Sequence, residues 1–233
     1  MRSAWILLPF ALVGRSVVAQ DRSSEVNAVP VFSEPHHHPV FQNALVRVLD
    51  VRVPPGETTL YHVHANRHIG VVISGARTWD QTRGQPASVV DSLADSAGSI
   101  FDNASEPLPY THRVGNADTV DFRYVVGQLL SSSGIDAPVL PASSGLRLER
   151  ETAGARVYRV TLAPGQSTDV HQHVQPGLTV QVGPGTLRLE GATPEAASAR
   201  SGAGAWWWRG AGTQHVLRNV GAQPIEVVEI DWR

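Results

Sequence analysis

The chain has 233 residues and a formal net charge of -2 at neutral pH, so it lacks the strongly basic character that nucleic-acid binding requires. All 19 basic residues are arginine and cysteine is absent, which excludes a lysine Schiff base, a thiolate nucleophile, iron–sulfur clusters and disulfides. Histidine is therefore the only nitrogen or sulfur side chain left as a good transition-metal ligand, and the chain has 10 histidines.

The first 19 residues have the pattern of a secretory signal. An early arginine precedes the apolar run 5–13, and small residues follow up to Ala19. The apolar run is too short to span a bilayer in the mature protein. We therefore expect cleavage after Ala19 and an exported protein, periplasmic or extracellular, with no membrane span in its mature form.

From about residue 44 the sequence indicates short β-strands separated by Pro, Gly, Asn and Asp, and no window has a sustained helical period. Apolar and polar residues alternate in the segments 49–53 (LDVRV) and 228–232 (VEIDW). Alternation of this kind is typical of an antiparallel strand that is buried on one face, and we predict two such half-buried strands here.

An internal repeat relates the two halves of the chain. The segment VRVLDVRVPPG (46–56) aligns with ARVYRVTLAPG (155–165), and continuing without a gap places His62 on His171 and His64 on His173. Further along, HRVGN (112–116) aligns with HVLRN (215–219). The segment 131–145 between the copies is rich in Ser, Pro and Gly. We predict two β domains, residues 28–130 and 146–233, joined by a linker over 131–145.

The repeated histidines have the spacing of a metal site. Residues i and i+2 of a strand point to the same face, so each H-x-H pair presents two imidazoles side by side. A later strand in each half supplies a third, His112 or His215. Three imidazoles at about 2.0 to 2.1 Å from one divalent ion leave open positions for a small ligand. Packing alone is the alternative, but it does not account for a duplicated and paired arrangement.

Both halves resemble cupins, whose first motif is G-x5-H-x-H-x3,4-E-x6-G and whose second ends in G-x2-H-x3-N. The first half matches with Gly56, His62, His64, Gly75, His112 and Asn116, and the second with Gly165, His171, His173, Gly204, Gly212, His215 and Asn219. The resemblance to two-domain cupins covers nearly all of the chain after the predicted signal. It implies an all-β protein with two double-stranded β-helix (jelly-roll) barrels in tandem, each with a metal inside.

Each half departs from the motif at its glutamate, which is His68 in the first half and Gly177 in the second. The first half is then a candidate four-histidine site, and the second resembles three-histidine cupin dioxygenases. The predicted metal ligands are His62, His64, His68, His112, His171, His173 and His215. For His68 a surface position at a strand turn stays open as the alternative. The metal, among Fe, Mn, Zn, Ni and Cu, is not identified, and no catalytic residue is assigned.

Four further features have interpretations of their own. The tract PHHHP (35–39) could add a ligand, but flanking prolines favour an exposed arm. The triplet WWW (206–208) is interpreted as core or domain-interface packing, in preference to a substrate-stacking wall. Gly177 is interpreted as part of a turn, and Arg209 as solvated, although it could attract an anion near the barrel mouth.

Two classes of function fit this pattern. Neutral ligands leave the charge of a divalent ion uncompensated, which favours an anionic organic substrate and a dioxygenase-type oxidoreductase. The alternative is a non-catalytic cupin that binds a small molecule or uses its metal for stability. Sugar isomerisation receives less weight because no acid–base pair stands out. The expected partner is a small molecule, and domains of this size favour assembly into a homo-oligomer.

Overall fold

The computed structural model describes residues 27–89, 96–142, 145–191, 194–198 and 201–233. The predicted signal over residues 1–19 lies outside the described residues. In the described ranges the protein is all-β apart from 3-10 turns, of which η2 (Val31–Ser33) is complete. None of the helical structure in these ranges is long and apolar enough to cross a membrane.

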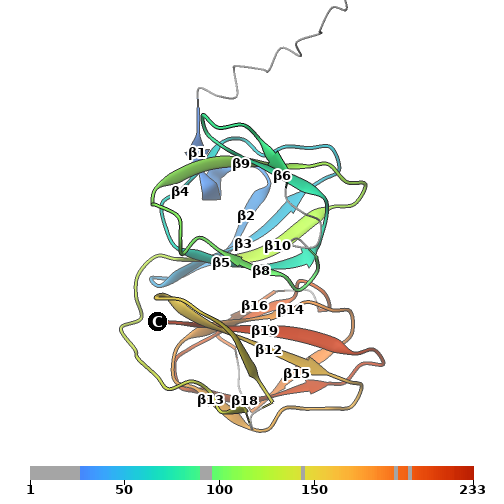
Figure 1. Cartoon of the computed structure of the whole chain (residues 1–233). Helices are drawn as coiled ribbons and strands as arrows, with labels where there is room; N and C mark the ends of the chain where they lie inside the picture. Colours follow the sequence, from blue (N-terminus) through green and yellow to red (C-terminus); the bar gives the residue numbers. More distant parts are fainter. Residues whose placement is uncertain (1–26, 90–95, 143–144, 192–193, 199–200) are drawn as a thin grey trace, which may run out of the picture.

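Two barrels follow one another along the chain, and Figure 1 shows them stacked. The strands of the first barrel are β1 (Val29–Pro30), β2 (His37–Gln42), β3 (Val46–Val53), β4 (His62–His64), β5 (His68–Ser74), β6 (Thr78–Thr82), β7 (Ser88–Val89), β8 (Ile100–Asp102), β9 (Tyr110–Asn116) and β10 (Phe122–Leu129). Those of the second are β11 (Arg147–Glu151), β12 (Ala155–Leu162), β13 (His171–His173), β14 (Gly177–Gln181), β15 (Leu187–Glu190), β16 (Ala196–Ala197), β17 (Trp206–Arg209), β18 (Thr213–Asn219) and β19 (Ile225–Trp232).

Each barrel is a sandwich of two curved sheets. In the first barrel one sheet has the order β1-β4-β9-β6-β7 and the other β2-β3-β10-β5-β8. In the second barrel the sheets are β11-β12-β19-β14-β17-β16 and β13-β18-β15. The non-consecutive neighbours in each sheet are the crossovers that wind a jelly roll.

The strand registers reproduce the sequence repeat. Val46 on β3 lies opposite Leu129 on β10, and the repeat-related Ala155 on β12 lies opposite Trp232 on β19. In the histidine strands, His62 pairs with His112 and His171 pairs with His215. Because the paired strands correspond, a residue in one barrel can be matched to the residue at the same register position in the other.

The barrels pack through the sheet β2-β3-β10-β5-β8 of the first and the six-stranded sheet of the second, which lie against each other at the centre of Figure 1. One apolar cluster contains Val71 and Val125 from the first barrel together with Trp206, Trp208 and Trp232 from the second. The interpretation of the tryptophan triplet as core or domain-interface packing is thus confirmed for Trp206 and Trp208. The prediction of a half-buried strand at 228–232 is wrong, because β19 is buried on both faces. Val228, Ile230 and Trp232 face the other barrel, so Glu229 and Asp231 face the interior of their own.

Candidate metal centres

The first candidate centre is a cluster of three histidines inside the first barrel. His62 and His64 lie on β4, and His112 lies beside them on β9. One ring nitrogen from each can be chosen so that all three lie within 4.8 Å of one another. The strand alternation expected from the H-x-H spacing therefore does bring these rings to one point.

Hydrogen bonds at the far side of the rings fix which nitrogens face the centre. His62 Nδ1 donates to the Leu60 carbonyl oxygen at 2.9 Å, and His112 Nδ1 donates to Asp80 Oδ2 at 2.5 Å. The Nε2 atoms of His64 and His112 lie 3.0 Å apart. Two imidazole nitrogens bound to one ion at about 2.0 to 2.1 Å would lie roughly 2.9 to 3.4 Å apart. The geometry therefore fits a divalent ion.

The environment favours the neutral form of His62 and His64, which coordination requires. Burial lowers the pKa of His62 well below its usual range, and the neighbouring His37 and His112 lower it further. Burial and the rings of His68 and His112 lower the pKa of His64 in the same way.

His68 lies inside the barrel, so a surface position for this residue is wrong. Its ring is 4.7 Å from that of His64 between centroids, and burial lowers its pKa to about 3. Its nitrogens do not fall within the group of converging ligand atoms formed by His62, His64 and His112. The structure thus places His68 beside a three-histidine centre, and its membership of the ligand set stays a prediction.

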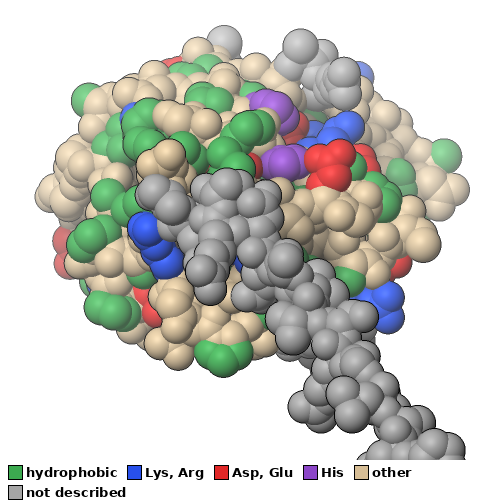
Figure 2. All heavy atoms as spheres, turned by 90° about the horizontal axis from the view of Figure 1, so that it is seen from above, with side chains coloured by type: hydrophobic (Ala, Val, Ile, Leu, Met, Phe, Trp, Pro, Cys, Tyr) green, Lys and Arg blue, Asp and Glu red, His purple; other side chains and the backbone are tan. Residues whose placement is uncertain are grey.

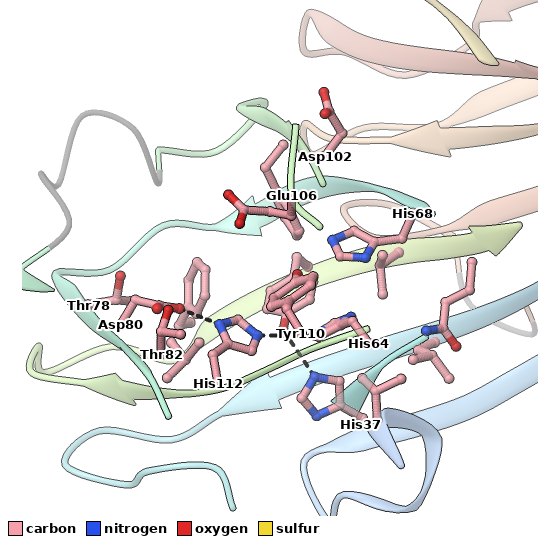
Figure 3. Close-up of a pocket in the computed structure, with 18 residues that line it drawn as sticks. His37, His64, His68, Thr78, Asp80, Thr82, Asp102, Glu106, Tyr110 and His112 are labelled. Atoms are coloured by element: carbon pink, nitrogen blue, oxygen red, sulfur yellow. Dashed lines mark hydrogen bonds and ion pairs between the residues drawn. The ribbon is translucent and has the colours of Figure 1, made fainter. Parts of the chain in front are cut away.

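A cavity of about 320 Å³ opens over the first centre. His64, His68 and His112 line it together with Asp80 and Tyr110, and Figure 3 shows His112 turned between Asp80 and the interior. The ring of Tyr110 stacks on that of His64, with centroids 4.7 Å apart and an angle of 8° between the planes. A small molecule in this cavity would therefore lie against the candidate metal ligands.

The tract 35–39 is exposed at Pro35, His38 and Pro39, as its prolines predict, but not at His37. His37 begins β2 and is buried beside the first centre, with its ring 4.6 Å from that of His62. The reason is a buried carboxylate, because His37 Nδ1 donates to Glu34 Oε2 at 2.5 Å. The other ring nitrogen of His37 accepts from the Tyr124 hydroxyl at 3.3 Å.

Removing the Glu34 carboxylate is expected to change stability in acid. Burial raises the pKa of Glu34, but bonds from His37 and His36 outweigh it and lower the pKa to about 2 from the ordinary 4.5. This contribution is complete above pH 4.5 and is lost as the pH falls towards 2. Glu34→Gln should therefore lower the melting temperature at neutral pH and flatten its decline in that window. Glu57→Gln, which removes an exposed partner of His36, should keep the wild-type slope; equal slopes in all three proteins would contradict this account.

Replacing Asp80 by asparagine is expected to weaken metal binding at the first centre about 10- to 100-fold, the usual cost of losing the hydrogen-bond partner of a ligand. Asp80 holds His112 in the tautomer that directs Nε2 inwards. Isothermal titration with Zn²⁺ measures the change, and Asp121→Asn, at a half-exposed aspartate that pairs loosely with Arg52, is the control. Unchanged affinity in Asp80→Asn would show that the contact does not support a ligand.

The second candidate centre contains a carboxylate that the sequence analysis missed. His171 and His173 on β13 and His215 on β18 meet Glu229, which β19 brings from the opposite sheet. Glu229 Oε2 lies 3.2 Å from His171 Nε2 and 3.1 Å from His173 Nε2, and its Oε1 lies 3.3 Å from His215 Nε2. The three-histidine reading of this half is therefore incomplete.

The hydrogen bonds around these rings require a positive charge at the centre. His171 Nδ1 donates to the Asp169 carbonyl oxygen at 2.9 Å, which leaves a lone pair on Nε2 of the neutral ring facing the Glu229 carboxylate. The contact is favourable only with a proton on that nitrogen or a cation between the two groups. Both ring nitrogens of His215 are buried without a hydrogen-bond partner. This donor set therefore fits a metal ion as well.

Fixed charges surround the second centre and seal it. Arg209 is only 1% exposed, so the expectation that it is solvated is wrong; its Nη2 donates to Asp231 Oδ1 at 2.8 Å. Burial raises the pKa of Glu229, but His173 and Arg209 outweigh it and hold the pKa well below its usual range. Burial and Arg209 lower the pKa of His173, but Glu229 and Asp231 outweigh them and raise it.

Gly177 explains how the arginine fits. It begins β14 and is not part of a turn, and a methyl group there would lie 2.5 Å from Arg209 Cζ and overlap the Ile230 carbonyl oxygen. In the equivalent ladders Gly177 pairs with Asp231, and His68 pairs with Gln128. At the position of the motif glutamate of cupins, Gly177 has no side chain, and the Arg209 guanidinium occupies the space.

The two barrels carry different residues at four equivalent interior positions. By their ladders, the first barrel has His68, Gly70, Val126 and Gln128 where the second has Gly177, Thr179, Glu229 and Asp231. The second set, with Arg209, forms a continuous charged network, in which Thr179 also donates to Glu229 Oε1 at 2.7 Å. The side chains of the first set are smaller or uncharged, and the cavity of the first barrel stays open. The open centre is therefore in the first barrel and the sealed one in the second.

Comparison with known proteins found no matching family model and no matching curated protein sequence. Solved structures do match. The crystal structure of AerE from Microcystis aeruginosa has a TM-score of 0.56 at 14% identity and covers 86% of this chain and 98% of its own. Salicylate 1,2-dioxygenase from Pseudaminobacter salicylatoxidans has a TM-score of 0.54 at 12% identity, with 81% of this chain and 71% of its own covered.

A cupin 2 conserved barrel domain protein from Leptotrichia buccalis has a TM-score of 0.50 at 8% identity and covers 84% of this chain and 88% of its own. At such identities the likeness concerns the fold, and it agrees with the two wound sandwiches and with the motif positions of the histidines. The chain therefore shares the fold of these proteins, and its two jelly-roll barrels in tandem are the fold that the resemblance to two-domain cupins predicts.

Proposed function

We propose that the protein is a metal-dependent oxidoreductase of the dioxygenase type that acts on a small organic substrate in the first barrel. One observation carries the proposal: the inward-facing nitrogens of His64 and His112 lie 3.0 Å apart at the wall of a cavity of about 320 Å³. That volume is at the lower end of the range for small-molecule sites, about 300 to 1,000 Å³. The structural likeness to a salicylate dioxygenase supports the reaction class.

The roles of the residues follow from their contacts. His62, His64 and His112 would hold the ion, and Asp80 would keep His112 in the required tautomer. A divalent transition metal bound there would bring an organic substrate and O₂ together, so that both oxygen atoms enter the product and no separate reductant is consumed. His68 and Tyr110 lie beside the ligands and would position the substrate.

The second barrel fits the non-catalytic alternative better. Its histidines, Glu229, Asp231 and Arg209 are all at most 5% exposed. A centre closed in this way can hold an ion or an ion-pair network for stability.

Metal analysis followed by oxygen uptake tests the proposal. The purified chain is loaded with Fe²⁺ and offered diketones, phenols and thiol acids, and oxygen consumption is expected with at least one class. The matched variant His112→Ala should abolish uptake. A chain that binds no metal, or that loads fully and consumes no oxygen with any of them, would favour the binding-module alternative.

We also propose that residues 1–19 direct export of the protein, because the charged start, apolar run and small residues match a secretory signal. Mass spectrometry of the protein recovered after expression should then show a chain that begins at Gln20. A full-length chain retained inside the cells would contradict the proposal.

A further inference from the structure

The walls of the first-barrel cavity are apolar and acidic, whereas an anionic substrate needs positively charged groups. We infer that the cavity takes an uncharged organic molecule with an aromatic or similarly apolar body, which acquires negative charge only on binding the metal through an ionisable hydroxyl group. This inference rests on the proposed function and specifies its substrate class. It departs from the expectation from sequence that the substrate is already an anion.

One wall of the cavity is apolar and aromatic. It is lined by Phe101, Phe122, Tyr124 and Val126. The ring of Tyr124 lies 5.1 Å between centroids from each phenylalanine ring, edge-on to Phe101 and tilted to Phe122. Phe101 reaches this place because its partner on β5 is Gly70, where any side chain would overlap the ring. A wall of this kind binds a flat apolar body by burial and ring packing.

Besides its histidines, the cavity is lined by acidic side chains. Asp80, Asp102 and Glu106 line it, and the described lining contains no arginine. Figure 3 shows Asp102 and Glu106 on the side of the cavity away from His37. In the view from above, acidic and histidine side chains lie close together on the surface, with arginine and hydrophobic side chains beside them. A ligand that enters with a negative charge therefore meets like charges.

Two of these carboxylates are already engaged and the third is not. Asp80 accepts from His112, and Asp102 pairs with Arg150 of the second barrel at 2.6 Å. Glu106 is exposed, and its carboxylate has no ion-pair partner in the described part of the chain. It is therefore the group that most strongly opposes an anion at the mouth.

The nearest arginines are committed to other contacts. Arg67 donates to the backbone carbonyl oxygens of Asn103 and Glu106, which ties its guanidinium to the loop. Arg113, next to His112, stacks over the rings of Tyr61 and Trp79. Neither guanidinium lines the cavity, although the charge of Arg67 still acts on His68 and Tyr110. Asp80 behind His112 partly compensates the positive charge of a bound ion.

Matched catechols test the charge preference without turnover. The full chain is loaded with Co²⁺ under argon, and the visible bands of the metal are followed during titration with 4-methylcatechol or with 3,4-dihydroxybenzoate. Both probes chelate through the same two hydroxyl groups and differ in a remote methyl or carboxylate. We expect 4-methylcatechol to bind at least about tenfold more tightly, and the ratio to shrink as salt is raised, because screening weakens repulsion between exposed charges.

The variant Glu106→Gln, checked for an unchanged Co²⁺ spectrum, should reduce this ratio at least about threefold, and Glu190→Gln in the second barrel should leave it unchanged. Equal or tighter binding of the carboxylate in the wild type would overturn the inference. So would a ratio that responds neither to salt nor to Glu106→Gln. Failure of the proposed function can be told apart from failure of this inference. If the first barrel takes up no Co²⁺, the result is seen before either catechol is added, and both proposals are wrong.

Discussion

The variant His62→Ala should lose the metal of the first barrel and with it all oxygen uptake. His62 supplies one of three converging nitrogens, and its Nδ1 is held by the Leu60 carbonyl oxygen so that Nε2 faces the centre. Losing a partner of a ligand costs about 10- to 100-fold in metal affinity, and losing the ligand itself should cost at least about 100-fold. Metal analysis and native mass spectrometry measure the loss per chain.

The second barrel should be unaffected by this change, because its centre uses other strands and a separate donor set. The matched control is Val63→Ala, between the two histidines on β4 with its side chain on the other face of the strand. If His62→Ala emptied both barrels, the two centres would not be independent. Full occupancy of the first barrel in the variant would show that His62 is a packing residue.

The positions of the histidines could be predicted because two local rules point to the same answer. Alternation along a strand puts His62 and His64 on one face, and the repeat carries the same spacing to His171 and His173. The cross-strand partners His112 and His215 then follow from the second motif copy. The registers His62 with His112 and His171 with His215 confirm that expectation.

Glu229 could not be assigned from sequence because alternation does not say which face of a strand is the inside. In 228–232 the apolar residues face the neighbouring barrel, so the acidic ones point into their own barrel. The contacts of Glu229 with His171 span 58 positions along the chain and depend on the closure of the barrel. His37 was missed for a related reason, since the carboxylate that draws it inwards, Glu34, has no signature in a proline-flanked tract.

The second large effect is expected from Glu229→Gln, which should destabilise the protein by about 3 to 5 kcal/mol, the usual cost of removing one partner from a buried charged network. Glu229 is completely buried, and it faces three imidazoles, the Thr179 hydroxyl and the Arg209 guanidinium. Glutamine keeps the shape but removes the negative charge. Arg209 then shares its positive charge with Asp231 alone.

Thermal unfolding followed by circular dichroism measures this effect. For a chain of this size each kcal/mol shifts the melting temperature by roughly 2 to 4 °C, so a fall of roughly 6 °C or more is expected. The control is Glu226→Gln on the same strand. Because Glu226 pairs with Arg159 at a partly exposed position, this change should cost about 1 kcal/mol or less.

Repeating both scans with a chelator shows whether an ion or a proton supplies the positive charge at the centre. If a metal holds the cluster together, the chelator lowers the wild type towards the variant, whereas an ion-pair network leaves the gap unchanged. A Glu229→Gln protein as stable as the control would mean that its carboxylate has no role in holding the second barrel.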